Sequence, residues 1–136
     1  MTALADIRKT VVLNAPIEKV WSAVATSKGL AAWWMDNSFE PVLGYEFVLH
    51  TGPYGDSPCK VTEINPPHRL CFTWGKDWSL AFELRELGGK TELTLIHSGW
   101  DTEKVTEFNQ PHTAIRGFME SGWGDLAKLR NYVEGQ

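Results

Sequence analysis

The chain has 136 residues, a formal net charge of -4 at pH 7, and hydrophobic and charged fractions of 43% and 22%. This length predicts one domain, spanning residues 1–136, with enough buried surface for a single core. The charge is spread along the chain without a basic run, which argues against a nucleic-acid partner and against binding to an anionic membrane surface.

The N-terminal part of the chain predicts one strand and two short helices. Residues 6–13 are rich in β-branched side chains, which is typical of a strand. The apolar spacing then changes to that of a helix, and Pro16 suits its first position because the missing N–H would be unpaired there anyway. A second short helix is expected after Ser27, ending near Trp34.

The middle of the chain predicts five strands. The first two are expected at 45–51 and 59–64, and the loop between them contains Gly and Pro residues that interrupt regular structure. The remaining three are expected within 69–98, where apolar residues fall on every second position.

Two hairpin turns fix the register of these last three strands. A two-residue turn at Gly88-Gly89 places Leu80 opposite His97. A three-residue loop before Trp78 places it opposite Trp74, whereas a two-residue loop would mix the apolar and polar faces. The resulting apolar face has His97 as its one polar member. Its other members are Leu70, Phe72, Trp74, Trp78, Leu80, Phe82, Leu84, Leu93 and Leu95.

The C-terminal segment predicts a long helix. Apolar residues recur at steps of three and four from Ile115 to Val133. A helix of about 20 residues is roughly 30 Å long, which is enough to cross an antiparallel sheet. One apolar sheet face and one apolar helix stripe need each other, so we expect an α+β domain in which the sheet packs against this helix.

The sequence also carries indications of location. Residues 1–10 lack the apolar segment of a signal peptide, and no stretch approaches the ~20 apolar residues of a membrane span. Cys59 and Cys71 have no C-x-x-C spacing, so we interpret them as reduced thiols, with a disulfide as the alternative. A cytoplasmic protein is therefore expected.

Four stretches resemble a known family in their order along the chain. They are "APIEKVWSAVATSKGLAAWW", "CKVTEINPPHRLCFTW", "LAFELRELGGKTELTLIHSGW" and "SGWGDLAKLRNYVEG". With them the chain resembles the START-like, or SRPBCC, superfamily, and within it the bacterial relatives of the C-terminal domain of the activator of the 90-kDa heat-shock protein ATPase. The resemblance implies the helix-grip, or Bet v 1-like, fold, in which a curved six-stranded antiparallel sheet wraps around a long C-terminal helix.

The resemblance further implies a cavity between the sheet and the C-terminal helix, closed at one end by the two short helices. The wall candidates in this sequence are Trp33, Trp34, Phe47, Phe72, Trp74, Trp78, Leu80, Phe82, Leu95, Phe118, Gly122 and Trp123. His97 is the polar candidate, because an inward histidine can orient a ligand or exchange a proton near neutral pH. Each of these residues, taken singly, is also a reasonable core residue.

Three functions follow as hypotheses. The first is binding of a small hydrophobic or aromatic molecule in the cavity, since such sites are mostly apolar with few polar groups. The second is a protein-interaction module, such as a chaperone cofactor, with a filled interior and an apolar patch outside. The third is a cavity enzyme of cyclase, dehydratase or hydrolase type, which needs at least two inward polar groups.

The sequence predicts no catalytic residue, metal site or cofactor. It contains no G-x-S-x-G elbow, no G-x-G-x-x-G and no P-loop. His50, His68 and His112 have no ligand spacing with His97 or with one another.

Overall fold

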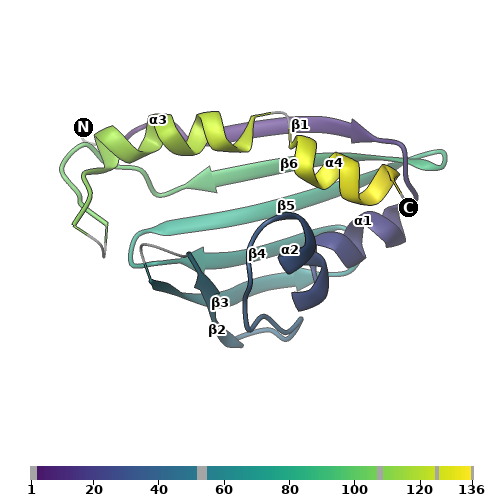
Figure 1. The fold of residues 1–136 in the computed structure, drawn as a ribbon, viewed down its shortest axis with the longest axis horizontal. Helices are drawn as coiled ribbons and strands as arrows, with labels where there is room; N and C mark the ends of the chain where they lie inside the picture. Colours follow the sequence, from purple (N-terminus) through teal and green to yellow (C-terminus); the bar gives the residue numbers. More distant parts are fainter. Residues whose placement is uncertain (1–2, 52–54, 107–108, 125, 136) are drawn as a thin grey trace.

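The computed structural model describes residues 3–51, 55–106, 109–124 and 126–135 (Figure 1). The predicted α+β order of one strand, two short helices, five strands and a helical C-terminus is confirmed. The elements are β1 (Ile7–Leu13), α1 (Ile17–Val24), α2 (Ser27–Trp33), β2 (Glu46–His50), β3 (Asp56–Asn65), β4 (Arg69–Trp74), β5 (Trp78–Leu87), β6 (Lys90–Ser98), α3 (His112–Trp123) and α4 (Ala127–Glu134).

The strands form one antiparallel sheet in the order β1-β6-β5-β4-β3-β2. Leu80 lies opposite His97, and Trp74 lies opposite Trp78. Both predicted hairpin registers are therefore correct. They follow from the alternation of apolar and polar residues, because a slip of one residue would turn a whole strand over.

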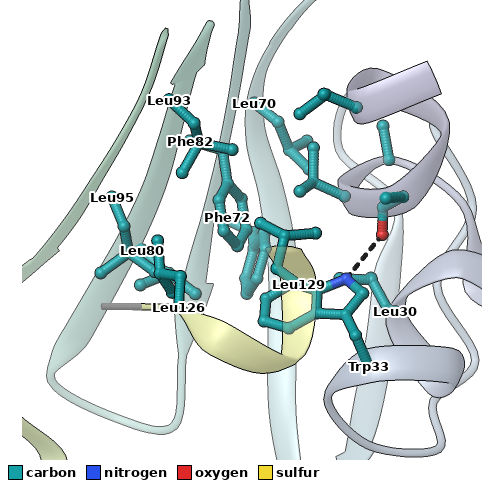
Figure 2. Close-up of a cluster of buried hydrophobic side chains, with 14 of the residues drawn as sticks. Leu30, Trp33, Leu70, Phe72, Leu80, Phe82, Leu93, Leu95, Leu126 and Leu129 are labelled. Atoms are coloured by element: carbon teal, nitrogen blue, oxygen red, sulfur yellow. Dashed lines mark hydrogen bonds between the residues drawn. The ribbon is translucent and has the colours of Figure 1, made fainter. Parts of the chain in front are cut away.

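The core lies on one face of the sheet, where α1, α2 and α4 cover the strands (Figure 1). Figure 2 shows Phe72, Leu80 and Phe82 from neighbouring strands lying close to Leu126 and Leu129. The three strand residues and Leu129 are fully buried. Each such side chain contributes about 1.5–3 kcal/mol by leaving water, so this cluster is a main source of the fold's stability.

Helices α1 and α2 meet closely because Gly29, in the first turn of α2, has no side chain. The Thr26 side chain accepts from the backbone N–H of Gly29 at 2.9 Å and so caps α2. A Cβ on Gly29 would lie 2.4 Å from the Ser22 carbonyl oxygen, so this approach requires glycine. The Trp33 indole N–H donates to the Ala23 carbonyl at 2.8 Å (Figure 2), which fixes Trp33 at the end of α2.

The C-terminal segment differs from its prediction, because it forms two helices and not one. Helix α3 ends at Gly124, whose φ is 49°, and Leu126, with φ of 60°, precedes α4. With a ψ of -127°, Gly124 has a backbone conformation that residues with a side chain rarely adopt, so glycine suits the end of α3. The apolar repeat continues from Trp123 through Leu126 to Leu129, so the repeat alone did not reveal the break.

Helix α4 is attached to the edge strand β1, and helix α3 to the residues just before that strand. The Arg116 guanidinium on α3 donates from Nε to the Ala5 carbonyl at 2.9 Å. The Arg130 guanidinium on α4 donates to the Val12 carbonyl at 3.1 Å. These bonds hold α3 near the start of β1 and α4 near its end, which leaves α3 beside the end of the sheet that carries Trp74 and Trp78.

The structure also bears on the two cysteines and on the predicted loop between the first two middle strands. Cys59 is buried and Cys71 half-buried, and the two are not joined by a disulfide, as predicted. Of the predicted loop between the first two middle strands, residues 52–54 lie outside the described residues, and the structure already assigns Asp56 to β3. Among the described helices, none has the length and apolar character needed to cross a membrane.

Candidate functional site

A pocket of about 570 Å³ lies beneath α3, between that helix, the ends of β4 and β5, and the helices α2 and α4. This volume is within the roughly 300–1,000 Å³ typical of small-molecule sites. Its walls are formed by Trp33, Trp34, Met35, His50, Thr51, Ser57, Trp74, Trp78, Thr106, Gln110, Ile115, Met119, Gly122, Trp123, Gly124, Leu126, Ala127, Lys128 and Leu129.

Five of the seven tryptophans line this pocket, and their rings form a connected wall. Trp34 stacks on Trp33 with ring centroids 5.9 Å apart and planes at 18°. It also lies 5.3 Å from both Trp74 and Trp123, and Trp74 lies 5.1 Å from Trp78. Rings from α2, β4, β5 and α3 therefore converge on one space, although these elements are far apart in the sequence.

Helix α3 contributes the opposite wall through a narrow stripe of Ile115, Met119, Gly122 and Trp123. Apart from its chain neighbours and its own helix backbone, no atom would lie within 4 Å of a Cβ added at Gly122. The helix is therefore not packed against anything at this position, and Gly122 leaves the pocket open there.

His97 lies beneath the tryptophan wall and does not line the pocket. Its ring centroid lies 5.1 Å from that of Trp74, 4.9 Å from that of Trp78 and 4.7 Å from that of Trp100. Burial among these rings, with smaller contributions from Arg116 and His112, lowers the pKa of His97 from 6.5 to about 3. The imidazole is therefore neutral at pH 7.

The hydrogen bonds of His97 define which ring nitrogen carries the proton. The Trp123 indole N–H donates to Nδ1 of His97 at 3.1 Å. An indole nitrogen can only donate, so Nδ1 is the acceptor and the hydrogen of the neutral ring is on Nε2. This bond also attaches the last residue of α3 to the sheet.

The pocket wall also contains polar residues, namely His50, Thr51, Ser57, Thr106, Gln110 and Lys128. His50 on β2 and Asp56 on β3 face each other across the two strands, with Nδ1 and Oδ1 2.7 Å apart, and both are largely exposed. Lys128 on α4 is also exposed. In the described part of the chain, no three His, Cys, Asp or Glu side chains come close enough to hold a metal ion.

Apart from Phe118, the predicted site residues fall into two groups. Those that line the pocket are Trp33, Trp34, Trp74, Trp78, Gly122 and Trp123. Those that face inward but are covered by other side chains are Phe47, Phe72, Leu80, Phe82, Leu95 and His97. The structure does not place this second group in the pocket wall: Leu126 and Leu129 lie near Phe72, Leu80 and Phe82, and Phe47 packs against Phe39.

Phe118 was also predicted to line the cavity, but the structure places it outside the pocket wall. Its side chain is 74% exposed, on the outer side of α3. At 100° per residue, the stripe from Ile115 to Trp123 is centred about 85° away from Phe118, so the helix turns this ring toward solvent.

Several pocket residues that the sequence did not suggest belong to the C-terminal segment. Ile115, Met119, Leu126 and Leu129 line the pocket and belong to the apolar repeat that predicted the helix. The same repeat therefore contained the signal. The repeat does not reveal the break after Trp123. It therefore did not show which of its residues face a cavity and which face the core.

The comparisons with known proteins agree with this fold. Protein BH1534 of Bacillus halodurans is 44% identical, with a TM-score of 0.85 over 98% of this chain and 99% of that one. The Aha1 protein of Colwellia psychrerythraea, solved as a dimer, is 21% identical, with a TM-score of 0.79 over 96% and 97% of the two chains. CalU16 of Micromonospora echinospora is 22% identical, with a TM-score of 0.75 over 94% and 75%.

Among curated proteins, none is significantly similar to the chain in sequence. The neighbours confirm the predicted helix-grip fold, with its open antiparallel sheet, short helices and helical C-terminus. Residues 14–134 match the family described as "Activator of Hsp90 ATPase homolog 1-like protein". The chain therefore belongs to this family, within the START-like, or SRPBCC, superfamily that the sequence resembles.

Proposed function

We propose that this protein binds a small apolar or aromatic molecule in the pocket beneath α3. The observation that carries the proposal is the pocket of about 570 Å³ with five tryptophans in its wall. Aromatic walls give affinity through the apolar area that a ligand removes from water, about 25 cal/mol per Å². The family's fold is consistent with ligand-binding and polyketide cyclase-like proteins, and it does not by itself select a ligand.

Gly122 allows a direct test. A leucine at this position meets no other part of the protein at its Cβ and extends toward the pocket, because Gly122 belongs to the pocket wall. We expect Gly122→Leu to fold and to lose most binding of N-phenyl-naphthylamine, a fluorescent apolar probe whose emission rises when it leaves water. Titration by fluorescence measures the affinity.

Gly117→Leu is the matched control, because it makes the same change on the same helix. Gly117 is exposed, also has no atom within 4 Å of an added Cβ, and does not line the pocket. The control is expected to bind the probe as the parent protein does. Failure of the parent protein to bind the probe, or equal binding by both variants, would contradict the proposal.

A second candidate function is protein interaction, for which the family description and Phe118 give support. Phe118 is a large apolar side chain that is 74% exposed, on a flank of α3 outside the pocket wall. If α3 binds a 90-kDa heat-shock protein through this ring, Phe118→Ser would abolish stimulation of that chaperone's ATPase. The same variant would leave binding of N-phenyl-naphthylamine unchanged.

A further inference from the structure

Helix α3 is held at its two ends and packed loosely along its middle. The structure describes α3 throughout, and only its first and last residues, His112 and Trp123, are buried. A Cβ added at Gly117 or Gly122 would have no atom within 4 Å outside its chain neighbours and its own helix backbone. A helix with so few buried side chains belongs to the part of a fold that opens at low cost in free energy.

The start of α3 is fixed by several contacts of His112. Its backbone N–H donates to the Lys104 carbonyl at 3.0 Å, and its Nδ1 accepts from the Asp101 backbone N–H at 3.2 Å. Its ring packs against Trp78 and Trp100, with ring centroids 5.8 and 5.5 Å away. This end of α3 therefore stays in place when the rest of the helix moves.

The other end of α3 is bonded to the sheet through Trp123, whose indole N–H donates to Nδ1 of His97 at 3.1 Å. Both residues are buried, so the bond is shielded from competing water. Directly after Trp123 the backbone leaves the helix, with φ of 49° and ψ of -127° at Gly124 and φ of 60° at Leu126. Hinges are commonly a few residues at the ends of elements, so α3 is able to move without α4.

The inner tryptophans of the pocket are closed off while α3 is in place. Trp33, Trp74 and Trp78 are 6%, 3% and 7% exposed, although all three line the pocket. Among the walls around them, β4 and β5 belong to the sheet, and α2 and α4 pack against each other and against α1. Helix α3 is therefore the wall whose movement disturbs the core least.

We propose that α3 is a lid over the pocket, and that the hydrogen bond from Trp123 to His97 is the latch that keeps it closed. The inference rests on the proposed function, because the lid covers the pocket that it assigns to the ligand. The space of about 570 Å³ exists with the latch bond formed, so the bond forms again over a bound ligand. His97 does not line the pocket and is a positioning residue, which holds Trp123 and not the ligand.

Two substitutions at one position break and retain the latch. His97→Leu removes the acceptor of the Trp123 N–H and leaves a buried side chain of similar size. His97→Asn is the matched control, because the asparagine oxygen can accept the same hydrogen bond. Trp123→Phe breaks the bond from the other side, so the test does not depend on one variant. Near-ultraviolet circular dichroism checks that each variant is folded.

Stopped-flow fluorescence with N-phenyl-naphthylamine measures the rate constants of association and dissociation. Opening precedes both entry and release, so both rate constants rise with the open fraction of the lid. We expect His97→Leu to raise both about tenfold, the effect of losing one buried hydrogen bond. Their ratio, the Kd, is expected to stay the same, because the latch is formed in the free and in the bound protein. His97→Asn is expected to keep the rate constants of the parent protein.

Hydrogen exchange of the indole N–H groups tests the lid without a ligand. The Trp74 ring lies 6.4 Å from that of Trp123, and its Nε1 is buried, so its hydrogen reaches water only when the lid opens. His97→Leu and Trp123→Phe are each expected to speed this exchange about tenfold, while His97→Asn leaves it unchanged. The Trp33 indole N–H, bonded to the Ala23 carbonyl, is the internal reference and is expected to exchange equally in all four proteins.

The outcomes separate the two proposals. Equal rate constants in the parent protein and His97→Leu, or a change in only one of them, overturn the latch and leave the pocket's function intact. An increase of the same size in His97→Asn has the same meaning, as does unchanged exchange at Trp74 in both latch-breaking variants. If the probe does not bind to the parent protein, the proposed function fails and the lid's role fails with it.

Discussion

Helix α4 buries Leu129 and Val133 in the core, whereas α3 buries only its first and last residues, His112 and Trp123. Helix α4 packs against α1, α2 and β1, while the inner stripe of α3 faces a pocket. The two helices continue one apolar repeat in the sequence. An apolar stripe therefore identifies an inward face, and its surroundings determine whether that face builds a core or covers a cavity.

The largest expected effect concerns α4. Leu129 is fully buried and lies in the cluster shown in Figure 2. Leu129→Ala is expected to lower the free energy of unfolding by about 2–5 kcal/mol, because it removes buried methyl groups and leaves a cavity. Met119→Ala, at a half-buried position of α3, is expected to cost less than about 1 kcal/mol. Urea unfolding measures both, and equal losses would show that α3 belongs to the core.

The next effect concerns His97, to which α3 is bonded through Trp123. Its pKa is lowered from 6.5 to about 3, so between these values the unfolded chain binds a proton that the folded chain does not. Stability is therefore complete above pH 6.5 and falls as the pH decreases, by about 1.4 kcal/mol per pH unit for this group. The free energy of unfolding, measured at pH 7.5 and 5.5, is expected to show this loss.

His97→Asn isolates the contribution of His97 from that of other titrating groups. The asparagine oxygen can accept the Trp123 hydrogen bond, and the side chain does not titrate. The variant is expected to lose about 1.4 kcal/mol less than the parent protein between these two pH values. An equal loss in both proteins would mean that His97 is not held neutral by its surroundings.

A comparable effect at Gly124 and a smaller one at Gly122 test the break between the two helices. Gly124 has a φ of 49° and a ψ of -127°, which strain any residue with a side chain, so Gly124→Ala is expected to cost about 1–2 kcal/mol. Gly122 lies within α3 with open space at its Cβ, so Gly122→Ala is expected to stabilise the protein by about 0.5–1 kcal/mol. Thermal unfolding of the two alanine variants measures both changes in stability. If both alanines stabilise the protein, the C-terminal segment is one continuous helix.

The same comparison explains what the sequence could predict. The strand registers were predictable, because Leu80 opposite His97 and Trp74 opposite Trp78 follow from a period of two and the turn lengths. The break between α3 and α4 was harder to predict. Gly124 is a usual signal for the end of a helix, but the apolar spacing continued past it to Leu129.

The site was predictable only in part, and for a related reason. The alternation of apolar and polar residues predicts that Phe82 and Trp74 both lie on the apolar face of the sheet. It does not show which side chains cover each of them. Leu126 and Leu129 cover the sheet near Phe82, as Figure 2 shows, whereas the end of the sheet with Trp74 remains open to the pocket. That difference depends on where α4 begins, which is a tertiary feature.

The most direct test of the pocket's role is the position of a bound ligand. Nuclear Overhauser effects between N-phenyl-naphthylamine and the protein's methyl groups report distances of a few ångströms. The account predicts contacts with Ile115, Met119 and Leu126, which line the pocket from α3 and the start of α4. Contacts confined to exposed apolar residues such as Val42 and Leu43, outside the pocket, would contradict it.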